Sequence, residues 1–149
     1  MVALIDIPTW CIALAAGASQ VILPAPKITL GWTHTVERTR WEEDYAASAG
    51  GVKILEARIE AFGAGMEPPA SAVRRGKWWH YRPALPTLRE VSLANSSFAG
   101  GYSVCWNGAC RPLNSIVPGG RQVAISARRC TSDPPQHLNA AADIGAAGD

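Results

Sequence analysis

The stretch YSVCWNGACRPL, residues 102–113, places two cysteines symmetrically around an Asn-Gly pair. Asn-Gly between strand-like residues is the strongest short-range signal for a β-hairpin, because both central residues of a type I′ turn need positive φ. With Asn107 and Gly108 at the turn, Cys105 and Cys110 fall opposite each other as a non-hydrogen-bonded pair. The Cα atoms of such a pair lie about 4.5 Å apart, which a disulfide can bridge. The stretch therefore predicts a tight hairpin closed by a Cys105–Cys110 disulfide.

The predicted disulfide also bears on the compartment in which the chain folds. Disulfides persist in oxidising compartments, so the bridge favours an exported protein. A zinc site is one alternative, but it needs two further ligands at suitable spacing. A redox-active dithiol is another, although such cysteines usually form a C-x-x-C motif, whereas four residues separate the two here. If export removes Cys11, Cys130 is expected to have no partner.

Alternating apolar and polar residues indicate strands elsewhere in the chain. In residues 51–62 the alternation places Leu55 on the buried face and Ile54 on the wet face. Residues 28–36 and 121–128 show the same period, and glycine pairs and prolines separate the runs. Several short strands with such breaks predict an all-β fold, either an antiparallel sandwich or a partly open barrel.

The chain has 149 residues, enough for one compact domain. The β domain is expected to span residues 27–130. Residues 131–149 are rich in Ala, Pro, Gly and Asp and hold almost no large apolar residue, which is typical of a disordered tail. Residues 1–26 form an apolar N-terminal segment outside this domain.

No charged residue occurs in residues 7–26, and the run WCIALAAGA within them matches a signal-peptide core of about 7 to 15 residues. Residues 16–18 have the A-x-A form of a cleavage site, although no Lys or Arg precedes the run. We therefore interpret residues 1–26 as a signal peptide or a membrane anchor, with a buried core helix as the alternative. The expected location is the periplasm, free or with a membrane tether facing it.

The charge balance gives no sign of nucleic-acid binding. Lys and Arg number 14 against 12 for Asp and Glu, which leaves a net charge of +2. A nucleic-acid-binding protein would concentrate basic residues on one face. Arg74, Arg75 and Lys77 form a short basic run before Trp78, which we interpret as a solvated loop, with a phosphate-binding patch as the alternative. No nucleic-acid partner is expected.

The stretches GWTHTVERTRWEEDY and IEAFGAGMEPP make the chain similar to a known family. It resembles small exported bacterial proteins grouped as a domain of unknown function, number eighteen-fifty, over roughly residues 28–126. The segments that carry the resemblance are HTVE at 34–37, EE at 42–43 and FGAG at 62–65. Thr35 replaces the usual serine and Arg40 a common proline. Members are often encoded beside TRAP-type transporters with a TAXI-class solute receptor, which implies transporter or receptor subunits as partners.

Polar residues of this region form the candidate binding site. His34, Glu37 and Glu43 could bind a small ligand or a metal ion, or supply a general base, if a bend brings the first two together. His34 also lies on the apolar face beside Trp32, where a structural hydrogen-bond network is the alternative. No metal ligand and no cofactor is assigned from the sequence.

Two further segments are candidates for binding. Gly63 and Gly65 lie in a loop that invites comparison with phosphate cradles, but it lacks the following Lys and helix, so backbone geometry is the simpler interpretation. In residues 78–81, alternation puts Trp78 and His80 on one face. One of the two faces is expected to be exposed and able to contact a ligand or a partner.

Two hypotheses of function follow. The first, which we favour, is an exported, non-enzymatic accessory protein of a TAXI-type TRAP transport system that docks through an exposed sheet face or edge. No nucleophile motif accompanies the candidate residues, and no catalytic residue is assigned. The second is a small-ligand or metal-binding module, with hydrolysis as one form of its activity, that uses His34, Glu37 and Glu43.

Overall fold

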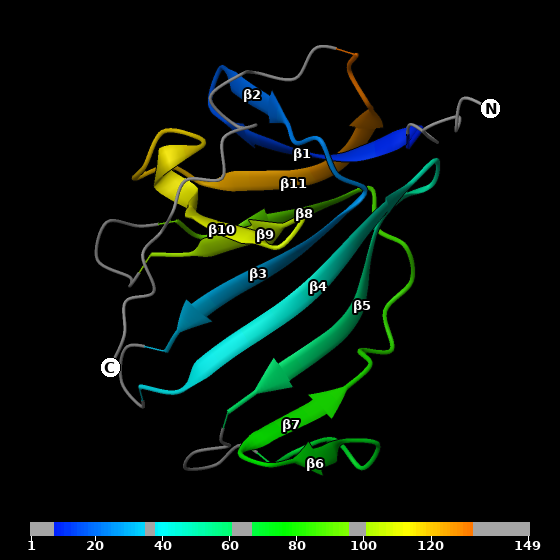
Figure 1. The fold of residues 1–149 in the computed structure, drawn as a ribbon, viewed down its shortest axis with the longest axis vertical. Coiled ribbons are helices and arrows are strands. Elements are labelled where there is room, and N and C mark those ends of the chain that lie inside the picture. Colours follow the sequence, from blue (N-terminus) through cyan, green and yellow to red (C-terminus); the bar gives the residue numbers. More distant parts are fainter. Residues whose placement is uncertain (1–7, 35–37, 61–66, 96–100, 133–149) are drawn as a thin grey trace, which may run out of the picture.

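The computed structural model describes residues 8–34, 38–60, 67–95 and 101–132. They form two antiparallel sheets that pack on each other without closing into a barrel (Figure 1). This architecture confirms the predicted all-β sandwich. Two packed sheets are a stable solution for strands of this kind, because each sheet buries one face against the other.

The larger sheet has the strand order β10-β9-β3-β4-β5-β7-β6. Its strands are β3 Lys27–Thr33, β4 Arg40–Ser48, β5 Gly51–Ile59, β6 Val73–Arg75, β7 Trp78–Tyr81, β9 Ser103–Trp106 and β10 Ala109–Pro112. The smaller sheet has the order β2-β1-β11-β8. Its strands are β1 Trp10–Ala16, β2 Ser19–Ile22, β8 Glu90–Leu93 and β11 Val123–Arg129, and a short 3-10 helix, η1 Leu113–Ser115, follows β10.

The core lies between the two sheets. Ile28 and Leu30 of β3 are buried there, as the alternation predicts, and so are Val123 and Ile125 of β11. The remaining buried members of this core include Ile12, Leu14, Tyr45, Val52, Ile54 and Val104. Each fully buried aliphatic side chain contributes about 1.5 to 3 kcal/mol, so this contact holds the sheets together.

The prediction that Leu55 faces the core and Ile54 faces solvent is wrong. Ile54 is buried in the core, and Leu55 is half-buried on the other side. The pairing of β4 with β5 shifts at this point, because Tyr45 lies opposite Ile54 whereas Asp44 lies opposite Glu56. The shift is a β-bulge, and one extra residue reverses the face to which a side chain points.

The apolar N-terminal segment contributes two strands to the smaller sheet. Strand β1 lies between β2 and β11, and Cys11 forms a disulfide with Cys130 across a Cα–Cα distance of 5.0 Å. The expectation that Cys130 has no partner is therefore wrong, because β1 brings Cys11 beside the end of β11. The smaller sheet includes strands from residues 10–22, which lie outside the predicted β domain of residues 27–130. Cleavage of this segment stays a prediction. Across the described ranges, the structure contains no helix that is long and apolar enough to cross a membrane.

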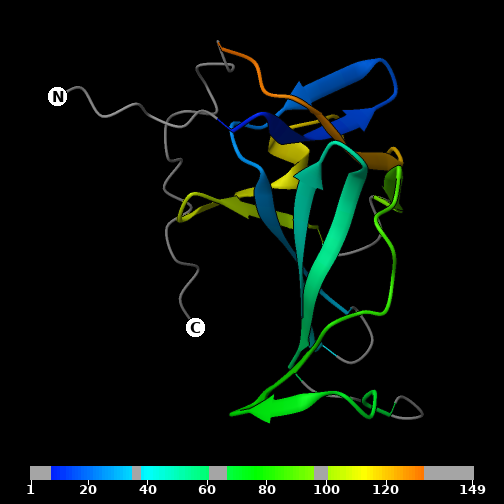
Figure 2. The same cartoon turned by 90° about the vertical axis from the view of Figure 1, so that its right-hand side faces the viewer.

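The larger sheet extends past the smaller one. Figure 2 shows the smaller sheet over one end of the long strands, with the β6–β7 hairpin at the opposite end. Because Ile28, Leu30 and Tyr45 pack toward the smaller sheet, their neighbours Thr29 and Asp44 point the other way. We call that opposite side of the larger sheet the outer face.

Candidate functional site

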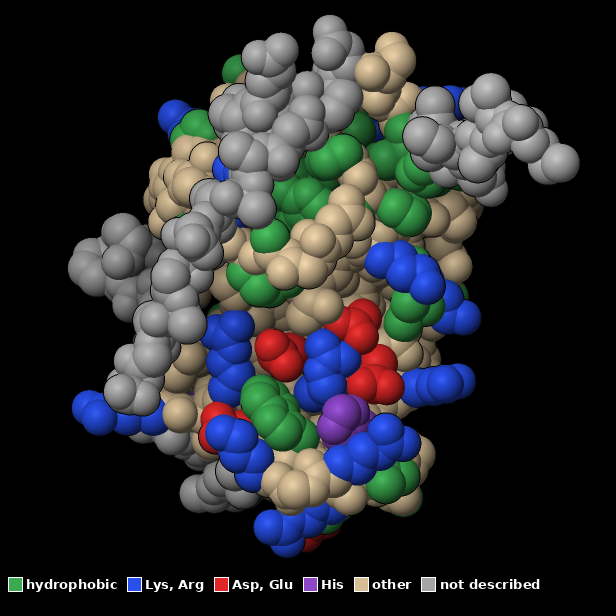
Figure 3. Space-filling model, viewed as in Figure 1, with side chains coloured by type: hydrophobic (Ala, Val, Ile, Leu, Met, Phe, Trp, Pro, Cys, Tyr) green, Lys and Arg blue, Asp and Glu red, His purple; other side chains and the backbone are tan. Residues whose placement is uncertain are grey.

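Charged side chains gather on the outer face (Figure 3). Strand register explains why they meet: Glu42 of β4 lies opposite Arg58 of β5, and Arg58 lies opposite His80 of β7. Asp44 and Glu56 form the next pair along the same two strands. Side chains directly opposite each other on one face are within reach of direct contact. Three neighbouring strands therefore bring two basic groups and three carboxylates onto one patch.

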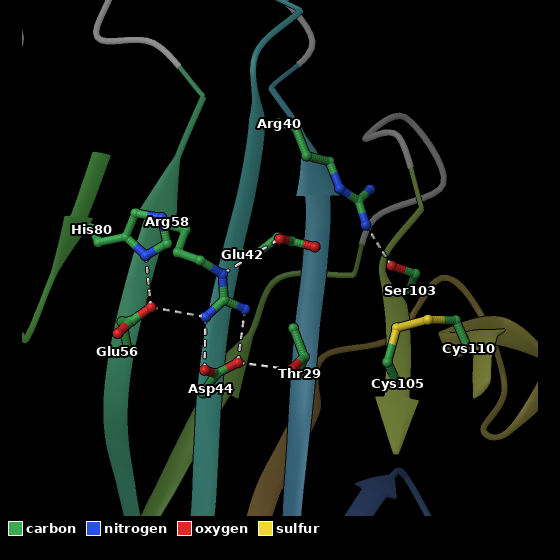
Figure 4. Close-up of polar contacts among 10 residues, drawn as sticks. All are labelled: Thr29, Arg40, Glu42, Asp44, Glu56, Arg58, His80, Ser103, Cys105 and Cys110. Atoms are coloured by element: carbon green, nitrogen blue, oxygen red, sulfur yellow. Dashed lines mark hydrogen bonds and ion pairs between the residues drawn. A yellow bond between two sulfur atoms is a disulfide. The ribbon is translucent and has the colours of Figure 1, made fainter. Parts of the chain in front are cut away.

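Arg58 lies at the centre of this patch (Figure 4). Its Nη1 donates to Asp44 Oδ2 at 2.7 Å, and its Nη2 donates to Asp44 Oδ1 at 2.8 Å. Nη1 also donates to Glu56 Oε1 at 3.1 Å, and Nε lies 3.5 Å from Glu42 Oε1. A bidentate guanidinium–carboxylate pair fixes both groups in direction as well as in distance. We call Thr29, Glu42, Asp44, Glu56, Arg58 and His80 the Arg58 network.

Two carboxyl groups of the network are held in the ionised form. The hydrogen bonds from Arg58 lower the pKa of Asp44, and the Thr29 hydroxyl adds a hydrogen bond to Asp44 Oδ1 at 2.7 Å. The pKa of Glu56 is lowered first by its contact with His80, whose Nδ1 lies 2.9 Å from Glu56 Oε1, and then by Arg58. Hydrogen bonds to the charged form of an acid favour that form. The patch therefore carries fixed, paired charges at neutral pH.

A second polar contact crosses the outer face above β3. Arg40 Nη2 donates to Ser103 Oγ at 2.8 Å (Figure 4). Both side chains lie close to Gly31 of β3. A Cβ atom at Gly31 would collide with the Arg40 guanidinium. The absence of a side chain at Gly31 is what lets strands β4 and β9 exchange a side-chain contact across β3.

Two cavities open on the outer face at opposite ends of the Arg58 network. One has a volume of about 560 Å³ and is lined by Thr29 and Asp44 of the network and by the Cys105–Cys110 hairpin. The other has a volume of about 270 Å³ and is lined by Glu56 and His80 of the network. We call them the hairpin cavity and the β6–β7 cavity. Residues of the Arg58 network line both cavities, so its paired charges lie on the sheet surface between them.

The wall of the hairpin cavity confirms the predicted disulfide. Cys105 lies opposite Cys110 across the β9–β10 ladder, and the two form a disulfide with a Cα–Cα distance of 3.9 Å. The turn residues Asn107 and Gly108 both have positive φ, at 50° and 82°. These values match the type I′ turn that the Asn-Gly pair predicts. Thr29 lies opposite Cys105, so the hairpin joins the larger sheet beside the network.

The predicted site residues do not gather in one place among the described residues. His34 is exposed after the end of β3, where its ring centroid lies 6.4 Å from that of Trp41. Glu37, Gly63 and Gly65 lie outside the described residues. In the parts of the chain that the structure describes, no group of three or more His, Cys, Asp or Glu side chains could hold a metal ion.

Glu43 lies on the opposite side of β4 from the Arg58 network. The Tyr45 hydroxyl donates a hydrogen bond to Glu43 Oε2, and burial raises the pKa of Glu43 above its ordinary value in spite of this bond. Burial, followed by the nearby Glu43 charge, raises the pKa values of Tyr81 and Tyr102. Glu43 is thus a half-buried carboxyl among phenol groups, separate from exposed His34.

Sequence reasoning did not select Arg58 or Glu56 as site residues, and it considered His80 only as part of the aromatic run at residues 78–81. The sequence does contain charged residues at alternate positions, which point to the same side of a strand. Glu42 and Asp44 are such a pair on one strand, and Glu56 and Arg58 are such a pair on the next. Alternation alone does not say which residue of one strand lies opposite which residue of the next. The β-bulge at Tyr45 and Leu55 shifts that pairing and cannot be placed from the period.

Comparison with known proteins identifies one family. The model of the family described as Domain of unknown function (DUF1850) matches residues 28–113. The match runs from β3 to the start of η1. It includes the Arg58 network, the hairpin disulfide and most lining residues of the two cavities. No curated protein and no solved structure matches the chain. Since the match covers more than half of the sequence, the chain belongs to the Domain of unknown function (DUF1850) family.

Proposed function

We propose that this chain is an exported, non-enzymatic accessory protein of a TAXI-class TRAP transport system. In this proposal it docks on a transporter or solute-receptor subunit through the outer face of its larger sheet, on the periplasmic side of the membrane. The resemblance of the segments within residues 34–65 to exported proteins encoded beside such transporters supports this choice of partner. The Arg58 network and its two neighbouring cavities support this choice of surface.

The observation that carries the proposal is the Arg58 network between two cavities. Arg58 has a side-chain exposure of 17%, and Asp44 and Glu56 have exposures of 30% and 34%, so a partner could reach these groups. Their mutual hydrogen bonds hold them in place before a partner arrives, which lowers the entropy lost on binding. Fixed charges of both signs also favour one docking register over others.

The two disulfides support the location. Cys11–Cys130 and Cys105–Cys110 include every cysteine of the chain. Disulfides of this kind form and persist in oxidising compartments, and a chain of this size with two of them is typical of an exported protein. A periplasmic position would place the outer face within reach of a solute receptor.

Co-purification tests the docking proposal. The chain is expressed in bacteria with TAXI-class receptor and transporter subunits, and each subunit recovered with it is quantified after crosslinking. Lys27 is exposed and lines the hairpin cavity, so Lys27→Glu should weaken recovery about tenfold by reversing a charge at the interface. Arg121→Glu is the matched control, because Arg121 is exposed beside the Gly17 turn of the smaller sheet. A chain that stays monomeric and alone, or equal losses in both variants, would contradict the proposal.

A further inference from the structure

Two exposed arginines that the Arg58 network does not use line the rim of the β6–β7 cavity. Arg75 and Arg82 both line this cavity of about 270 Å³, together with the imidazole of His80. Neither arginine has an ion-pair or hydrogen-bond partner among the residues that the structure describes. Two guanidinium groups in one hollow repel each other, so an anion between them would stabilise both.

The pairing of β6 with β7 explains why these side chains share a hollow. Val73 lies opposite His80 and Arg75 lies opposite Trp78, so alternation puts Arg75 on the same side as His80. Arg82 follows the end of β7 by one residue and lines the same cavity as His80. The basic run is exposed to solvent, as the sequence predicts, but Arg75 ends the edge strand β6 and does not lie in a loop.

Arg74 shows that the placement is selective. It precedes Arg75 on β6, and alternation points it to the other side of the sheet. Its Nε donates to the Gly76 carbonyl at 3.0 Å, and it does not line the cavity. Of the two arginines on β6, only Arg75 lines the β6–β7 cavity.

We infer that the β6–β7 cavity binds a small organic carboxylate, held between Arg75 and Arg82. Guanidinium groups pair with carboxylates through two parallel N–H···O bonds, and the Ser71 hydroxyl in the same lining can donate a further bond. Glu56 also lines the cavity and is already paired with Arg58 and His80. A nearby carboxylate disfavours a ligand of double negative charge, so a monocarboxylate is preferred over phosphate.

Titration of the full chain tests this inference without any transporter subunit. Propionate and inorganic phosphate are titrated separately at constant ionic strength, and binding is followed by NMR shifts of residues 71–82. We expect saturable propionate binding that is tighter than phosphate binding. Arg75→Gln and Arg82→Gln should each weaken propionate binding about tenfold or more, the effect of losing one hydrogen-bonded charge. Arg74→Gln removes the same charge from the same strand and should leave the affinity unchanged.

Three results would overturn the inference: no saturable propionate binding, tighter binding of phosphate, or equal weakening by Arg74→Gln and Arg75→Gln. The third would mean that only the general positive charge of the hairpin attracts anions. Unchanged circular dichroism and melting temperature in each variant show that the fold is retained. Because the chain is tested alone, failure here leaves the docking proposal standing, and failure of docking leaves this inference standing.

Discussion

The charged form of Glu43 is disfavoured by the aromatic side chains around it. It lies between Trp41 and Tyr45 along β4, on the side of the sheet opposite the Arg58 network. The rings of Trp32 and Trp41 stack at 5.9 Å, and Tyr102 lies 5.7 Å from Trp32. A carboxylate among such groups loses hydration that one phenol hydrogen bond replaces only in part. The raised pKa of Glu43 expresses that cost.

Replacing Glu43 by Gln should stabilise the protein at neutral pH. An acid whose folded pKa lies above its unfolded pKa binds protons more tightly when folded, so its contribution to stability falls as pH rises above the ordinary value of 4.5. Gln keeps an oxygen acceptor for the Tyr45 hydroxyl and has no charge to lose. We expect Glu43→Gln to raise the free energy of unfolding by about 1 kcal/mol at pH 7, the low end of the cost of burying a polar group whose hydrogen bonds are incompletely replaced.

Urea unfolding at several pH values measures this effect. Below pH 4 the wild-type carboxyl is protonated in both states, so the two proteins should differ little. Glu42→Gln is the matched control, since Glu42 is the neighbouring acid on the outer face and pairs with Arg58. A Glu43→Gln protein that is less stable than wild type at pH 7 would show that the carboxylate is stabilising where it lies.

At the scale of elements, the join between β5 and the segment before β8 depends on one close approach. Val52 and Leu88 form an isolated antiparallel bridge, with Val52 N donating to Leu88 O at 2.7 Å and Leu88 N donating to Val52 O at 2.8 Å. Gly51, with φ of +126°, lies against the same carbonyl group. This bridge links a long strand of the larger sheet to the chain that enters the smaller one.

Gly51→Ala should break that join. A Cβ atom at Gly51 would collide with the Leu88 carbonyl oxygen and lie 2.9 Å from its carbon, and both are backbone atoms that cannot rotate away. Strained φ and overpacking together should cost about 2 to 4 kcal/mol of unfolding free energy. Gly76→Ala is the control, because Gly76 has φ of +63° but nothing within 4 Å, and it should cost about 1 kcal/mol. Equal losses in urea unfolding would mean that backbone strain alone, and not the contact with Leu88, decides the cost.

The elements also show which sequence patterns are reliable. The Cys105–Cys110 hairpin could be predicted because its turn, register and disulfide lie within a few residues of each other. Ile28 and Leu30 could be assigned to the core because β3 contains no irregularity. Leu55 could not be assigned, because its direction depends on a bulge formed by the pairing of two strands.

At the scale of the whole molecule, the Cys11–Cys130 disulfide ties the first strand of the fold to the last. Its cysteines are 119 residues apart, whereas those of the hairpin disulfide are 5 apart. A cross-link that closes a longer loop removes more conformational entropy from the unfolded chain. Strand β1 also places Ile12 and Leu14 in the core, so the bridge holds an element that the core needs.

Removing the two disulfides should therefore have unequal effects. From loop length alone, Cys11→Ala with Cys130→Ala should cost about 5 kcal/mol, and Cys105→Ala with Cys110→Ala about 2 kcal/mol. Urea unfolding of the two double variants measures the difference. The mass of the exported chain with and without reductant checks the starting state, since two bridges lower the mass by about four hydrogens. Equal losses, or a deficit of only about two hydrogens, would show that Cys11 does not tie the mature protein together.

The strand period, the all-β class and the hairpin disulfide could be predicted from the sequence, because each depends on residues that are neighbours along the chain. The Cys11–Cys130 bond and the position of Arg58 among three carboxylates and beside His80 follow only from the folded arrangement. The same holds for the cavity that Arg75 and Arg82 both line. These contacts join strands whose order and register come from packing two sheets over one core, and residue spacing carries no direct record of that packing.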